Sequence, residues 1–529
     1  MITKLYNFRS VLAALLFVMP LLGFAQNQWI NIAERKKGGD DELLTKTIQQ
    51  AIDQAAKDGG GTIYFPAGDY LTGAIHFKSN ITLHLDAGAV LRFSDDFDNY
   101  LPFVQMRWEG TVMNNFSPLI YAENVKNIAI TGRGTIDGQG KKWWNAMYDI
   151  ELAKEKRPLN KYQKMWQEAN PDLETSEYYQ RTMNLKFFRP PLFQAFKSEN
   201  ILIEGITIQN SPFWTINPAF CDNIRITGVT IFNPPSPNTD GINPTSCKNV
   251  HISDCHISVG DDCITIKSGR DADGRKWATP TENVTITNCT MLSGHGGVVI
   301  GSEVSGGIKK VTISNCVFDG TDRGIRLKTA RGRGGVVEDI RVSNVVMNNI
   351  QKEAIMINMY YDKNTKVGPV TEETPVFRNI HFSGITGQDI NTAAKVLGIE
   401  EMPVSNIRFS DIDMQAKEGF YISKASGVEI HDVTVTTELG SSFEVLNSDV
   451  VVLDNVKTQK PLQNTPVVKL ENVKQVVLSN TALFKPMDLF LSVSGEENKD
   501  IYLQNNLTPY AKKDIIKSKE VNTNAIIQK

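Results

Sequence analysis

The chain has 529 residues, of which 41% are hydrophobic and 22% are charged, and its formal net charge is −3. This balance excludes a general nucleic-acid-binding protein, which carries a strong positive excess, and the apolar content is enough to bury a large core. Beyond the N-terminus no stretch approaches the roughly 20 apolar residues of a transmembrane helix. We therefore expect a protein with no membrane span and no nucleic-acid partner.

Residues 1–25 have the pattern of an export signal. Lys4 and Arg9 supply positive charge, residues 11–22 are almost all apolar, and Ala25 is a small residue suited to cleavage. The apolar run is too short to span a bilayer, which weakens the alternative of an N-terminal membrane anchor. The pattern predicts a signal peptide over residues 1–25 and a periplasmic or secreted protein that begins near Gln26.

Residues 26–120 are predicted to form an N-terminal cap and the first coils of the fold. Apolar residues recur at helical spacing at Leu44, Ile48, Ala51, Ile52 and Ala55. This spacing is typical of an amphipathic helix with one buried face. A turn and a strand follow at residues 59–68. We interpret the helix as a cap that closes one end of a stacked structure.

Residues 121–505 contain a repeat. Its unit is a polar residue, alternating apolar residues, a turn residue and another apolar residue, and it recurs at intervals of 23 to 40 residues. The clearest copies begin at Asn200, Asn223, Asn249, Asn283, Lys310, Asp339, Asn379 and Asn406. Each copy is typical of a strand, a turn and a second strand, and no long helix fits between copies.

The repeat predicts an all-β solenoid, the parallel β-helix. Variable loops can lengthen single coils of such a stack, whereas the blades of a propeller repeat more evenly. A β-sandwich stays open as an alternative, although it does not explain why the units share one internal phase. Residues 506–529 are polar and lysine-rich, and we expect either a C-terminal cap or a partly disordered tail there.

The cysteines follow the phase of the repeat. Cys255, Cys289 and Cys316 occupy the position that isoleucine or valine holds in the other copies. That position must face the core, where cysteine acts as a small buried hydrophobic residue. We expect free thiols, and a disulfide between Cys221 and Cys247 on adjacent coils is the alternative left open.

One segment, at about residues 141–186, departs from the repeat. It combines many charges with the aromatic residues Trp143, Trp144, Tyr148, Tyr162, Trp166, Tyr178 and Tyr179. We predict a large, partly helical insertion between early coils. Insertions on one face of a solenoid often belong to the binding face, and packing against the outside of the barrel is an equal alternative.

Polar residues align in columns when the second halves of four consecutive coils are superposed. One column holds Thr239, Asp261, His295 and Asp322, and the next holds Asp240, Asp262, Gly296 and Arg323. Two further columns hold Asn243, Thr265, Val299 and Arg326, and then Thr245, Lys267, Gly301 and Lys328. Because neighbouring strands lie about 4.7–4.9 Å apart, we expect Asp240, Asp261 and Asp262 to lie close together.

Three adjacent carboxylates favour acid–base chemistry. Their repulsion raises the pKa of at least one of them, so that one carboxyl group keeps its proton near neutral pH. A protonated carboxyl group beside an ionised one can protonate a glycosidic oxygen and activate water. A calcium site built from carboxylate oxygens and a solvated turn are simpler interpretations that stay open. His295, Arg326 and Lys328 follow on the next coils and could tune the acids or hold an anion.

Four short motifs occur in order in this region. They are Asn238-Thr239-Asp240, Gly260-Asp261-Asp262, Gly294-His295-Gly296 and Arg326-Leu327-Lys328. At these residues the chain resembles the polygalacturonase family of pectin-degrading glycoside hydrolases, family 28. The resemblance covers most of the mature chain, and Leu327 stands where isoleucine is frequent in the family. It implies a right-handed parallel β-helix and hydrolysis with inversion of configuration.

The resemblance also implies catalytic roles. Asp261 would be the general acid, Asp240 and Asp262 would hold and activate water, and His295 would support the acid. Inverting enzymes usually separate acid and base by about 6.5–9.5 Å, which is more than the spacing of stacked strands. We therefore expect Asp261 to project differently from the other two carboxylates. No metal or other cofactor is expected.

The expected partner is a pectic polysaccharide or oligosaccharide, bound by a monomer. The substrate-binding candidates are Asn238, Lys267, Arg326, Lys328 and Tyr360, with Arg326 and Lys328 assigned to the galacturonate carboxylate by the resemblance. Basic residues on this face would concentrate positive charge for a polyanion: Lys267, Arg270, Arg275, Lys276, Arg326, Lys328, Arg331 and Arg333. Trp214 and Asn217, in the preceding coil, could line a neighbouring subsite.

Endo and exo action both stay open. The insertion and the loop 267–280 could wall off one end of the binding face, which would favour exo action. The linkage that is cut, within homogalacturonan, a rhamnogalacturonan backbone or a side chain, is equally open. Two other classes of protein remain alternatives: a β-helix polysaccharide lyase that needs calcium, and a non-catalytic β-helix that binds carbohydrate.

Overall fold

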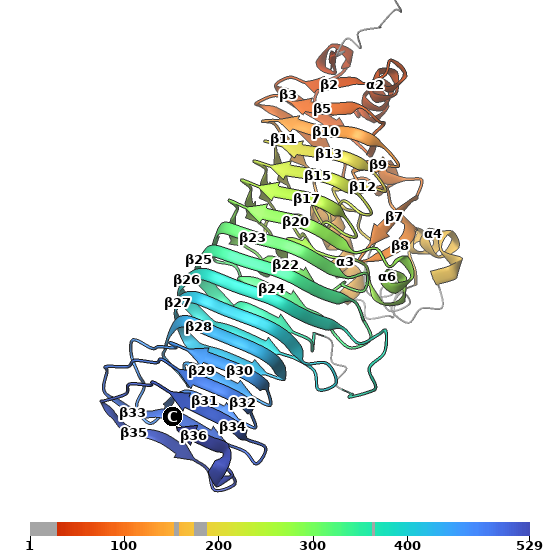
Figure 1. Ribbon diagram of the computed structural model, residues 1–529. Helices are drawn as coiled ribbons and strands as arrows, with labels where there is room; N and C mark the ends of the chain where they lie inside the picture. The colour runs from red at the N-terminus through yellow and green to blue at the C-terminus, as the bar shows by residue number, and fades with distance from the viewer. Residues whose placement is uncertain (1–28, 153–157, 174–187, 362–365, 529) are drawn as a thin grey trace, which may run out of the picture.

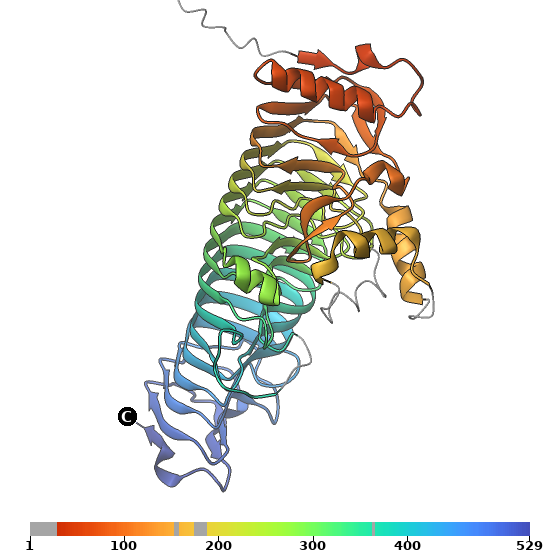
Figure 2. The ribbon, with the colours of Figure 1, turned by 90° about the vertical axis from the view of Figure 1, so that its right-hand side faces the viewer.

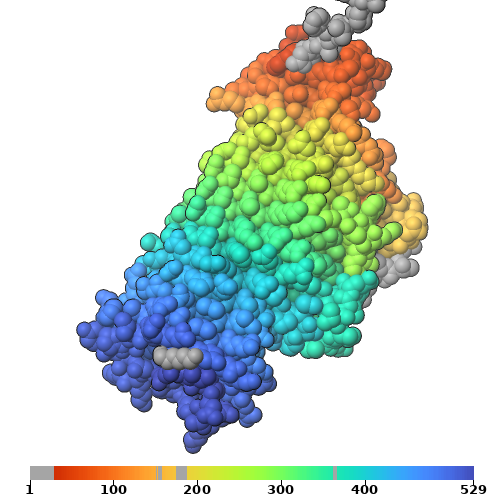
Figure 3. Space-filling model, in the orientation of Figure 1, coloured from red at the N-terminus to blue at the C-terminus, as the bar shows by residue number. Residues whose placement is uncertain are grey.

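The computed structural model describes residues 29–152, 158–173, 188–361 and 366–528. The predicted signal peptide and two aromatic residues of the insertion, Tyr178 and Tyr179, lie outside the described residues. The described chain forms a long column of stacked coils whose two termini lie at opposite ends (Figure 1, Figure 3). Within these ranges no helix combines the length and the apolar character that crossing a membrane requires.

Strands of successive coils pair in parallel, which confirms the predicted parallel β-helix. Early coils contribute strands to three rows. The first row contains β2 (Gly61–Phe65), β5 (Ile81–Leu85), β10 (Lys126–Gly132), β13 (Glu199–Glu204), β15 (Asp222–Thr227), β17 (Lys248–Ser253), β20 (Thr281–Thr287) and the beginning of β23 (Ile308–Asp319). The second row contains β3 (Gly68–Thr72), β6 (Ala89–Phe93), β11 (Thr135–Asp137), β14 (Thr207–Gln209), β16 (Thr230–Phe232), β18 (His256–Ser258) and β21 (Thr290–Ser293).

The third row carries the residues of interest. It contains β4 (Ile75–His76), β9 (Ile120–Glu123), β12 (Phe193–Phe196), β19 (Asp262–Ile266), β22 (Gly296–Gly301) and β24 (Ile325–Lys328). Isolated bridges at Ile216 and Ile242 continue the row between β12 and β19.

Longer strands and a last set of short strands complete the column. β25 (Val336–Asn358), β26 (Val376–Leu397), β27 (Val404–Ser423) and β28 (Ala425–Thr437) bend through more than one row. After them come β29 (Phe443–Leu446), β30 (Asp449–Asp454), β31 (Pro466–Glu471), β32 (Lys474–Ser479), β33 (Met487–Ser494), β34 (Lys499–Gln504), β35 (Ala511–Lys517) and β36 (Ile526–Gln528).

The polar residue that begins each repeat unit has a conformational role. Asn200, Asn223, Asn249 and Asn283 adopt φ values between +55° and +58°, a left-handed conformation that asparagine tolerates better than most side chains. Their amides stack from coil to coil: Nδ2 of Asn223 donates to Oδ1 of Asn200 at 2.8 Å, and Nδ2 of Asn283 donates to Oδ1 of Asn249 at 3.0 Å. Each coil therefore turns at the same place, which keeps the strands in register.

The interior of the column is apolar along its length. Cys255, Cys289 and Cys316 are at most 1% exposed, as their position in the repeat predicts. All six cysteines are buried free thiols, so Cys221 and Cys247 are not bridged. The cysteines thus contribute to the core as small hydrophobic side chains.

Elements near the chain termini form the two ends of the column in different ways. At the N-terminal end, β1 (Trp29–Asn31), the short helix η1 (Ala33–Arg35) and α2 (Thr45–Lys57) precede β2, and β1 pairs with β2. Ile48, Ala51, Ile52 and Ala55 of α2 are fully buried, which confirms the predicted helical cap. At the other end, β35 pairs with β33, and β36 pairs with β34 after the short helix η4 (Thr523–Ala525). The C-terminal segment therefore continues the column.

Several elements lie outside the column, on one of its sides (Figure 1, Figure 2). They are η2 (Phe97–Tyr100), the antiparallel hairpin of β7 (Val104–Trp108) and β8 (Thr111–Asn115), α3 (Lys141–Leu152), α4 (Lys161–Ala169), η3 (Pro171–Leu173) and α6 (Asp271–Trp277). The insertion is thus partly helical, as predicted. Trp143 of α3 is buried, with its ring 4.1 Å from that of Phe97.

Candidate active site

Successive coils of the third row pair at the positions that the repeat predicts. The observed pairs are Ile242 with Ile264, Asp262 with Gly296, Thr265 with Val299, Val299 with Arg326, Thr245 with Lys267 and Gly301 with Lys328. Asp240 and Asp262 each stand two residues before a paired isoleucine, so they are neighbours on adjacent coils. The predicted columns are confirmed.

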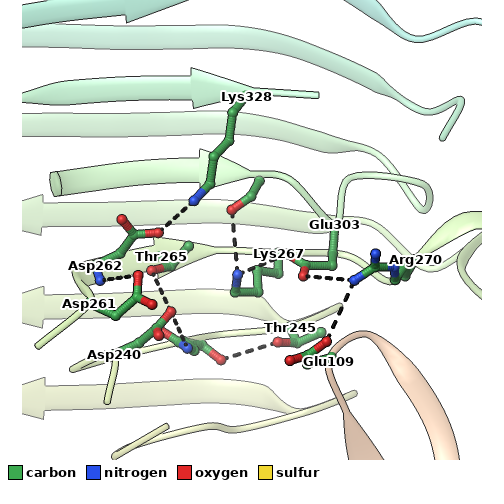
Figure 4. A network of polar contacts seen from close by, with 12 residues as sticks. Glu109, Asp240, Thr245, Asp261, Asp262, Thr265, Lys267, Arg270, Glu303 and Lys328 are labelled. Atoms are coloured by element: carbon green, nitrogen blue, oxygen red, sulfur yellow. Dashed lines mark hydrogen bonds and ion pairs between the residues drawn. The ribbon is translucent and has the colours of Figure 1, made fainter. Parts of the chain in front are cut away.

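The three aspartates form one cluster with unequal exposure (Figure 4). One oxygen from each of Asp240, Asp261 and Asp262 lies within 4.8 Å of the corresponding oxygen of the other two. Asp240 and Asp262 are buried, at 3% and 1% exposure, whereas the side chain of Asp261 is 18% exposed. Asp261 is therefore the most accessible of the three, and the expectation that it projects away from the pair stays a prediction.

Glycines beside the aspartates allow the coils to approach closely. A Cβ atom at Gly260 would lie 2.2 Å from the carbonyl oxygen of Ser236 in the preceding coil. Gly294 has a φ of +152°, and a Cβ atom there would lie 2.5 Å from the carbonyl oxygen of Asp261. Only glycine fits such positions without moving the backbone. Close packing between coils thus explains why glycine precedes Asp261 in one motif and His295 in the other.

Asp240 is held by neutral donors. Nδ2 of Asn243 donates to its Oδ2 at 3.0 Å, and Oγ1 of Thr265 donates to the same oxygen at 3.3 Å. Both donors are themselves buried, and both belong to the column of Arg326. These contacts fix the orientation of the carboxyl group without a direct ion pair.

Asp261 and Asp262 have charged partners. The ammonium of Lys328 lies 2.8 Å from Oδ2 of Asp262. Oδ1 of Asp261 accepts the backbone N–H of Asp262 at 2.9 Å and lies 3.2 Å from Nδ1 of His295. His295 is 55% exposed, so its ring connects the cluster to solvent.

The surroundings separate the proton affinities of these groups. Burial raises the pKa of Asp240 well above its usual range, and the charge of Asp261 adds to the shift. Burial also acts to raise the pKa of Asp261, but the hydrogen bond and charge of His295, with the ammonium of Lys328, outweigh it and lower that pKa. The hydrogen bond to Asp261 raises the pKa of His295 against the opposing effect of burial. In the free protein Asp240 and His295 are therefore protonated in preference to Asp261. These three groups interact, so they titrate together.

This arrangement can perform acid–base chemistry on a bond placed beside Asp261. It combines a half-exposed acid–imidazole pair with two buried carboxyl groups that face it. The same three carboxylates could also hold a cation, but Lys328 and His295 already occupy one oxygen each of Asp262 and Asp261. Calcium takes six to eight oxygen ligands, so the cluster offers a poor set of ligands for it.

The predicted substrate-binding cations differ in what they contact. Lys267 is 5% exposed and pairs with Glu303 at 2.8 Å, with its ammonium 4.7 Å from the ring of Trp214. Lys328 pairs with Asp262. Arg326 lies over the ring of Tyr361 at 5.4 Å and forms no ion pair with any described carboxylate. Arg326 is thus the cation best prepared to receive an anionic substrate.

The expectation that basic residues concentrate positive charge on this face is wrong for most of them, because they are paired with carboxylates. Arg270 lies 3.6 Å from Glu109, Arg275 lies 2.9 Å from Glu373, Arg331 pairs with Glu401, and Arg333 lies 3.1 Å from Asp271. The acidic partners come from the hairpin, from α6 and from loops far along the chain, which the local pattern of basic residues does not reveal. Figure 4 shows Lys267, Glu303, Arg270 and Glu109 as one connected network beside the aspartates.

Two further candidates have protein partners, and their roles in binding substrate stay predictions. Asn238 adopts a φ of +55°, and its Oδ1 accepts a hydrogen bond from Nη2 of Arg189 at 2.7 Å. The hydroxyl of Tyr360 donates to Glu400 at 2.9 Å and accepts the ammonium of Lys424 at 2.8 Å. Its neighbour Tyr361 is the tyrosine that lies against Arg326 and Lys328.

An aromatic wall borders the cluster on its N-terminal side. Trp214 stands two residues before the bridged Ile216, and so occupies the column of Asp240 and Asp262 one coil earlier. Stacked rings cover it, and we define the aromatic wall as Trp108, Trp166, Phe188, Phe213 and Trp214. All five are at most 4% exposed.

The wall joins the column to the elements outside it. The ring of Trp166 from α4 stacks on Phe188 at 4.4 Å, Trp108 of the hairpin stacks on Phe213 at 5.3 Å, and Phe213 stacks on Trp214 at 5.1 Å. The packing alternative for the insertion is therefore confirmed for Trp143 and Trp166, and its role in the binding face stays a prediction. Asn217, by contrast, is 1% exposed and donates to the carbonyl of Asn243 within the stack.

The sequence patterns missed the wall residues Trp108, Phe188 and Phe213, and they missed Glu109 and Glu303 of the ion-pair network. These residues form no motif of their own, and the repeat pattern does not distinguish them from their neighbours. The adjacency of Phe213 and Trp214 before the first motif is the one signal that could have directed attention to this side.

Comparisons with known proteins agree on one family. Over residues 60–184 and 180–426 the chain matches glycosyl hydrolases family 28. It is 34% identical over 386 residues to a probable polygalacturonase from Vitis vinifera, across 71% of this chain and 72% of the relative. It is 31% identical over 364 residues to an endo-polygalacturonase from Pectobacterium carotovorum subsp. carotovorum, across 66% and 79%. The solved structure of a hyperthermoactive exopolygalacturonase from Thermotoga maritima matches with a TM-score of 0.68 at 33% identity, across 77% and 92%.

Proposed function

This chain belongs to glycosyl hydrolases family 28 and is a pectin-degrading hydrolase of the polygalacturonase type, and from this premise we propose that it is exo-acting. It removes galacturonate-containing units from one end of a pectic chain. The observation that carries this proposal is the aromatic wall. Trp214 occupies the position next to Asp240 on the N-terminal side and is buried, so a substrate cannot continue past it.

The chemical step follows from the contacts of the cluster. Asp261 is the most exposed of the three carboxylates and protonates the glycosidic oxygen as the bond to the anomeric carbon breaks. Its low pKa in the free protein leaves it short of a proton, and the imidazolium of His295, 3.2 Å away, supplies one. A proton relay of this kind needs donor and acceptor within hydrogen-bond distance.

The attacking water is assigned to the buried pair. Asp240 keeps its proton and can donate a hydrogen bond to the water oxygen. Oδ1 of Asp262 is buried and has no hydrogen-bond donor among the described residues, so it is the oxygen that can accept the proton of the water. Lys328 holds the other oxygen of Asp262, and the unpaired guanidinium of Arg326 is assigned to a galacturonate carboxylate.

Water attack opposite the departing sugar inverts the anomeric configuration. The closest carboxylate oxygens lie within 4.8 Å, whereas inverting enzymes usually separate the two carboxyl groups by about 6.5–9.5 Å. The family resemblance and the greater exposure of Asp261 support inversion. Proton NMR of the first product formed tests it, because retention of the anomeric configuration would overturn this assignment.

Product analysis tests exo action. Polygalacturonate labelled at its reducing end is digested and sampled from the first minutes. Exo action releases one short product from the outset, while the remaining polymer shortens gradually. A broad ladder of oligomers at the earliest times would contradict the proposal, and the position of the label tells which chain end is attacked.

We also propose that the protein is exported and acts as a monomer in the periplasm or outside the cell. The pattern of residues 1–25 supports export. Exposed large hydrophobic residues lie in separate parts of the column, with Phe232 on β16 and Phe484 and Tyr510 near the C-terminus, which supports a monomer. Cell fractionation with N-terminal sequencing of the mature protein tests the first point, and light scattering tests the second.

A further inference from the structure

A second polar pocket lies on the third row, C-terminal to the candidate active site. Arg326 pairs with Met356, Met356 with Lys395, and Lys395 with Tyr421. Arg326, Lys395 and Tyr421 are partly exposed, whereas Met356 is 5% exposed. At about 4.8 Å per coil, Lys395 is roughly 10 Å and Tyr421 roughly 14 Å from Arg326 along the column. Figure 1 shows β25, β26, β27 and β28 following one another in this direction.

The pocket has a volume of about 210 Å³ and is lined by Thr392, Lys395, Glu418, Gly419, Phe420, Tyr421, Leu439, Gly440, Ser441 and Glu444. It combines one cation, Lys395, with the ring of Tyr421, several hydrogen-bonding groups and two carboxylates, Glu418 and Glu444. The ammonium of Lys395 lies over the ring of Tyr421 at 5.8 Å. Such a combination is suited to a sugar that carries a carboxylate, because the ring packs on the apolar face of the sugar while polar groups receive its hydroxyls and its charge.

The charges of the pocket leave Lys395 available. Oε2 of Glu418 accepts the hydroxyl of Thr392 at 3.0 Å, and Glu444 lies 3.6 Å from the ammonium of Lys469. Lys395 forms neither an ion pair nor a hydrogen bond with any described residue. Its ammonium can therefore accept a carboxylate without breaking an existing pair.

We propose that this pocket is a distal subsite for a galacturonate residue of the chain that is being cut. The proposal rests on the proposed exo action: if the wall stops the substrate on the N-terminal side, the uncut remainder must leave along the C-terminal coils. That remainder passes Arg326 and Tyr361 and reaches Lys395, which binds a carboxylate, and Tyr421, which packs on a sugar ring. The subsite would favour long substrates over short ones.

The test is the dependence of kcat/KM on chain length for oligogalacturonates from the trisaccharide to the polymer. Lys395→Gln and Tyr421→Ala should each lower kcat/KM by about threefold to tenfold for long substrates. Both should leave the trisaccharide unchanged, because it is too short to reach the pocket. Lys309→Ala is the matched control, since this partly exposed lysine lies on β23 in the first row and pairs with Glu282 at 3.4 Å.

Two results would overturn the subsite. One is an equal loss at all chain lengths, which indicates a general effect on the fold. The other is no loss at any length while the wild-type protein cuts from one chain end. Calorimetric binding of a long oligomer to the unmodified protein and to Lys395→Gln gives a readout besides turnover. If the wild-type protein instead releases a ladder of internal products, exo action fails and the length dependence is judged separately.

Discussion

At the scale of single residues, burial divides the work among three chemically identical side chains. Asp240 is enclosed by neutral donors, and burial raises its pKa, which favours its protonated form. Asp262 is equally buried but is paired with Lys328. Asp261 is partly exposed and faces His295, which lowers its pKa. In the proposed mechanism, aspartate and histidine thereby supply a proton donor, a proton acceptor and a group that reprotonates the donor.

The role of Asp261 leads to a prediction about turnover. Asp261→Asn keeps the shape of the side chain but removes the transferable proton, so kcat should fall by at least about 10²-fold. Affinity for an oligogalacturonate should stay unchanged, because Asp261 is not assigned to ground-state binding. Asp322→Asn is the control, since Asp322 belongs to the same column but pairs with Lys352. Near-normal kcat in Asp261→Asn would refute the mechanism.

The raised pKa of His295 predicts a pH dependence. The imidazolium must be present to return a proton to Asp261, so activity is kept below this raised pKa and is lost as the pH rises through it. In His295→Gln the alkaline limb of the kcat profile should disappear, and the remaining activity should be low. His381→Gln, whose histidine lies on β26 in the first row, should keep the wild-type profile. An unchanged alkaline limb in His295→Gln would contradict the relay.

The raised pKa of His295 also makes the stability of the fold depend on pH. Because the pKa of His295 is higher in the folded protein than in the unfolded chain, its ion pair with Asp261 stabilises the fold at low pH. That contribution is lost as the pH rises through the folded-state pKa. The half-exposed position of His295 keeps the effect small, since solvent screens the pair.

At the scale of elements, loops and helices outside the coils decide where the binding face ends. The hairpin β7–β8 brings Trp108 to the wall and Glu109 to Arg270, while α4 brings Trp166. These elements precede the catalytic coils in the chain, yet they close the side next to Asp240. In the proposed function, the coils supply the catalytic residues, and the elements outside them limit which bond of a polymer can reach those residues.

Removing one ring of the wall should therefore change both stability and products. Trp166→Ala deletes a 1% exposed side chain, which should cost about 3–5 kcal/mol in the free energy of unfolding. The opened wall should let longer products leave, so early digests should contain oligomers absent from the wild type. Tyr148→Ala in α3 is the control, because this tyrosine is 44% exposed. If the variant is destabilised but its product profile is unchanged, the wall does not cause exo action.

At the scale of the whole molecule, the column is asymmetric about the site. The aromatic wall closes the face one coil before Asp240, whereas the third row continues through β31, β33 and β35 on the other side. Under the proposed exo action, a linear polymer that lies along the stack extends in one direction only. This asymmetry connects exo action with the distal subsite at Lys395.

The whole protein should need no calcium. Treatment with a chelator should leave both kcat and the melting temperature unchanged, because Lys328 and His295 already engage Asp262 and Asp261. The measurement is activity and thermal unfolding before and after exhaustive chelation, with calcium added back. A loss that calcium restores would show that the cluster is a metal site and would reopen the lyase interpretation.

The sequence by itself determined the fold and the register of the site. The polar residue that begins each unit takes a left-handed conformation, and the apolar positions after it alternate. One phase therefore predicts where every coil turns and which residues stack. This phase places Asp240, Asp261, Asp262, His295 and Arg326 on neighbouring coils of one row.

Only the tertiary structure decided the electrostatics and the limits of the binding face. Lys267 pairs with Glu303, and Arg270 pairs with Glu109. Such ion pairs neutralise most of the basic residues that were expected to form a positive surface. The wall likewise joins Trp108 and Trp166 to Trp214 across long stretches of chain. Ion pairs and packing depend on loops of irregular length and path, and no periodicity connects such residues. The repeat specifies which residues stack within the column, while contacts across the column depend on the folded arrangement of the loops.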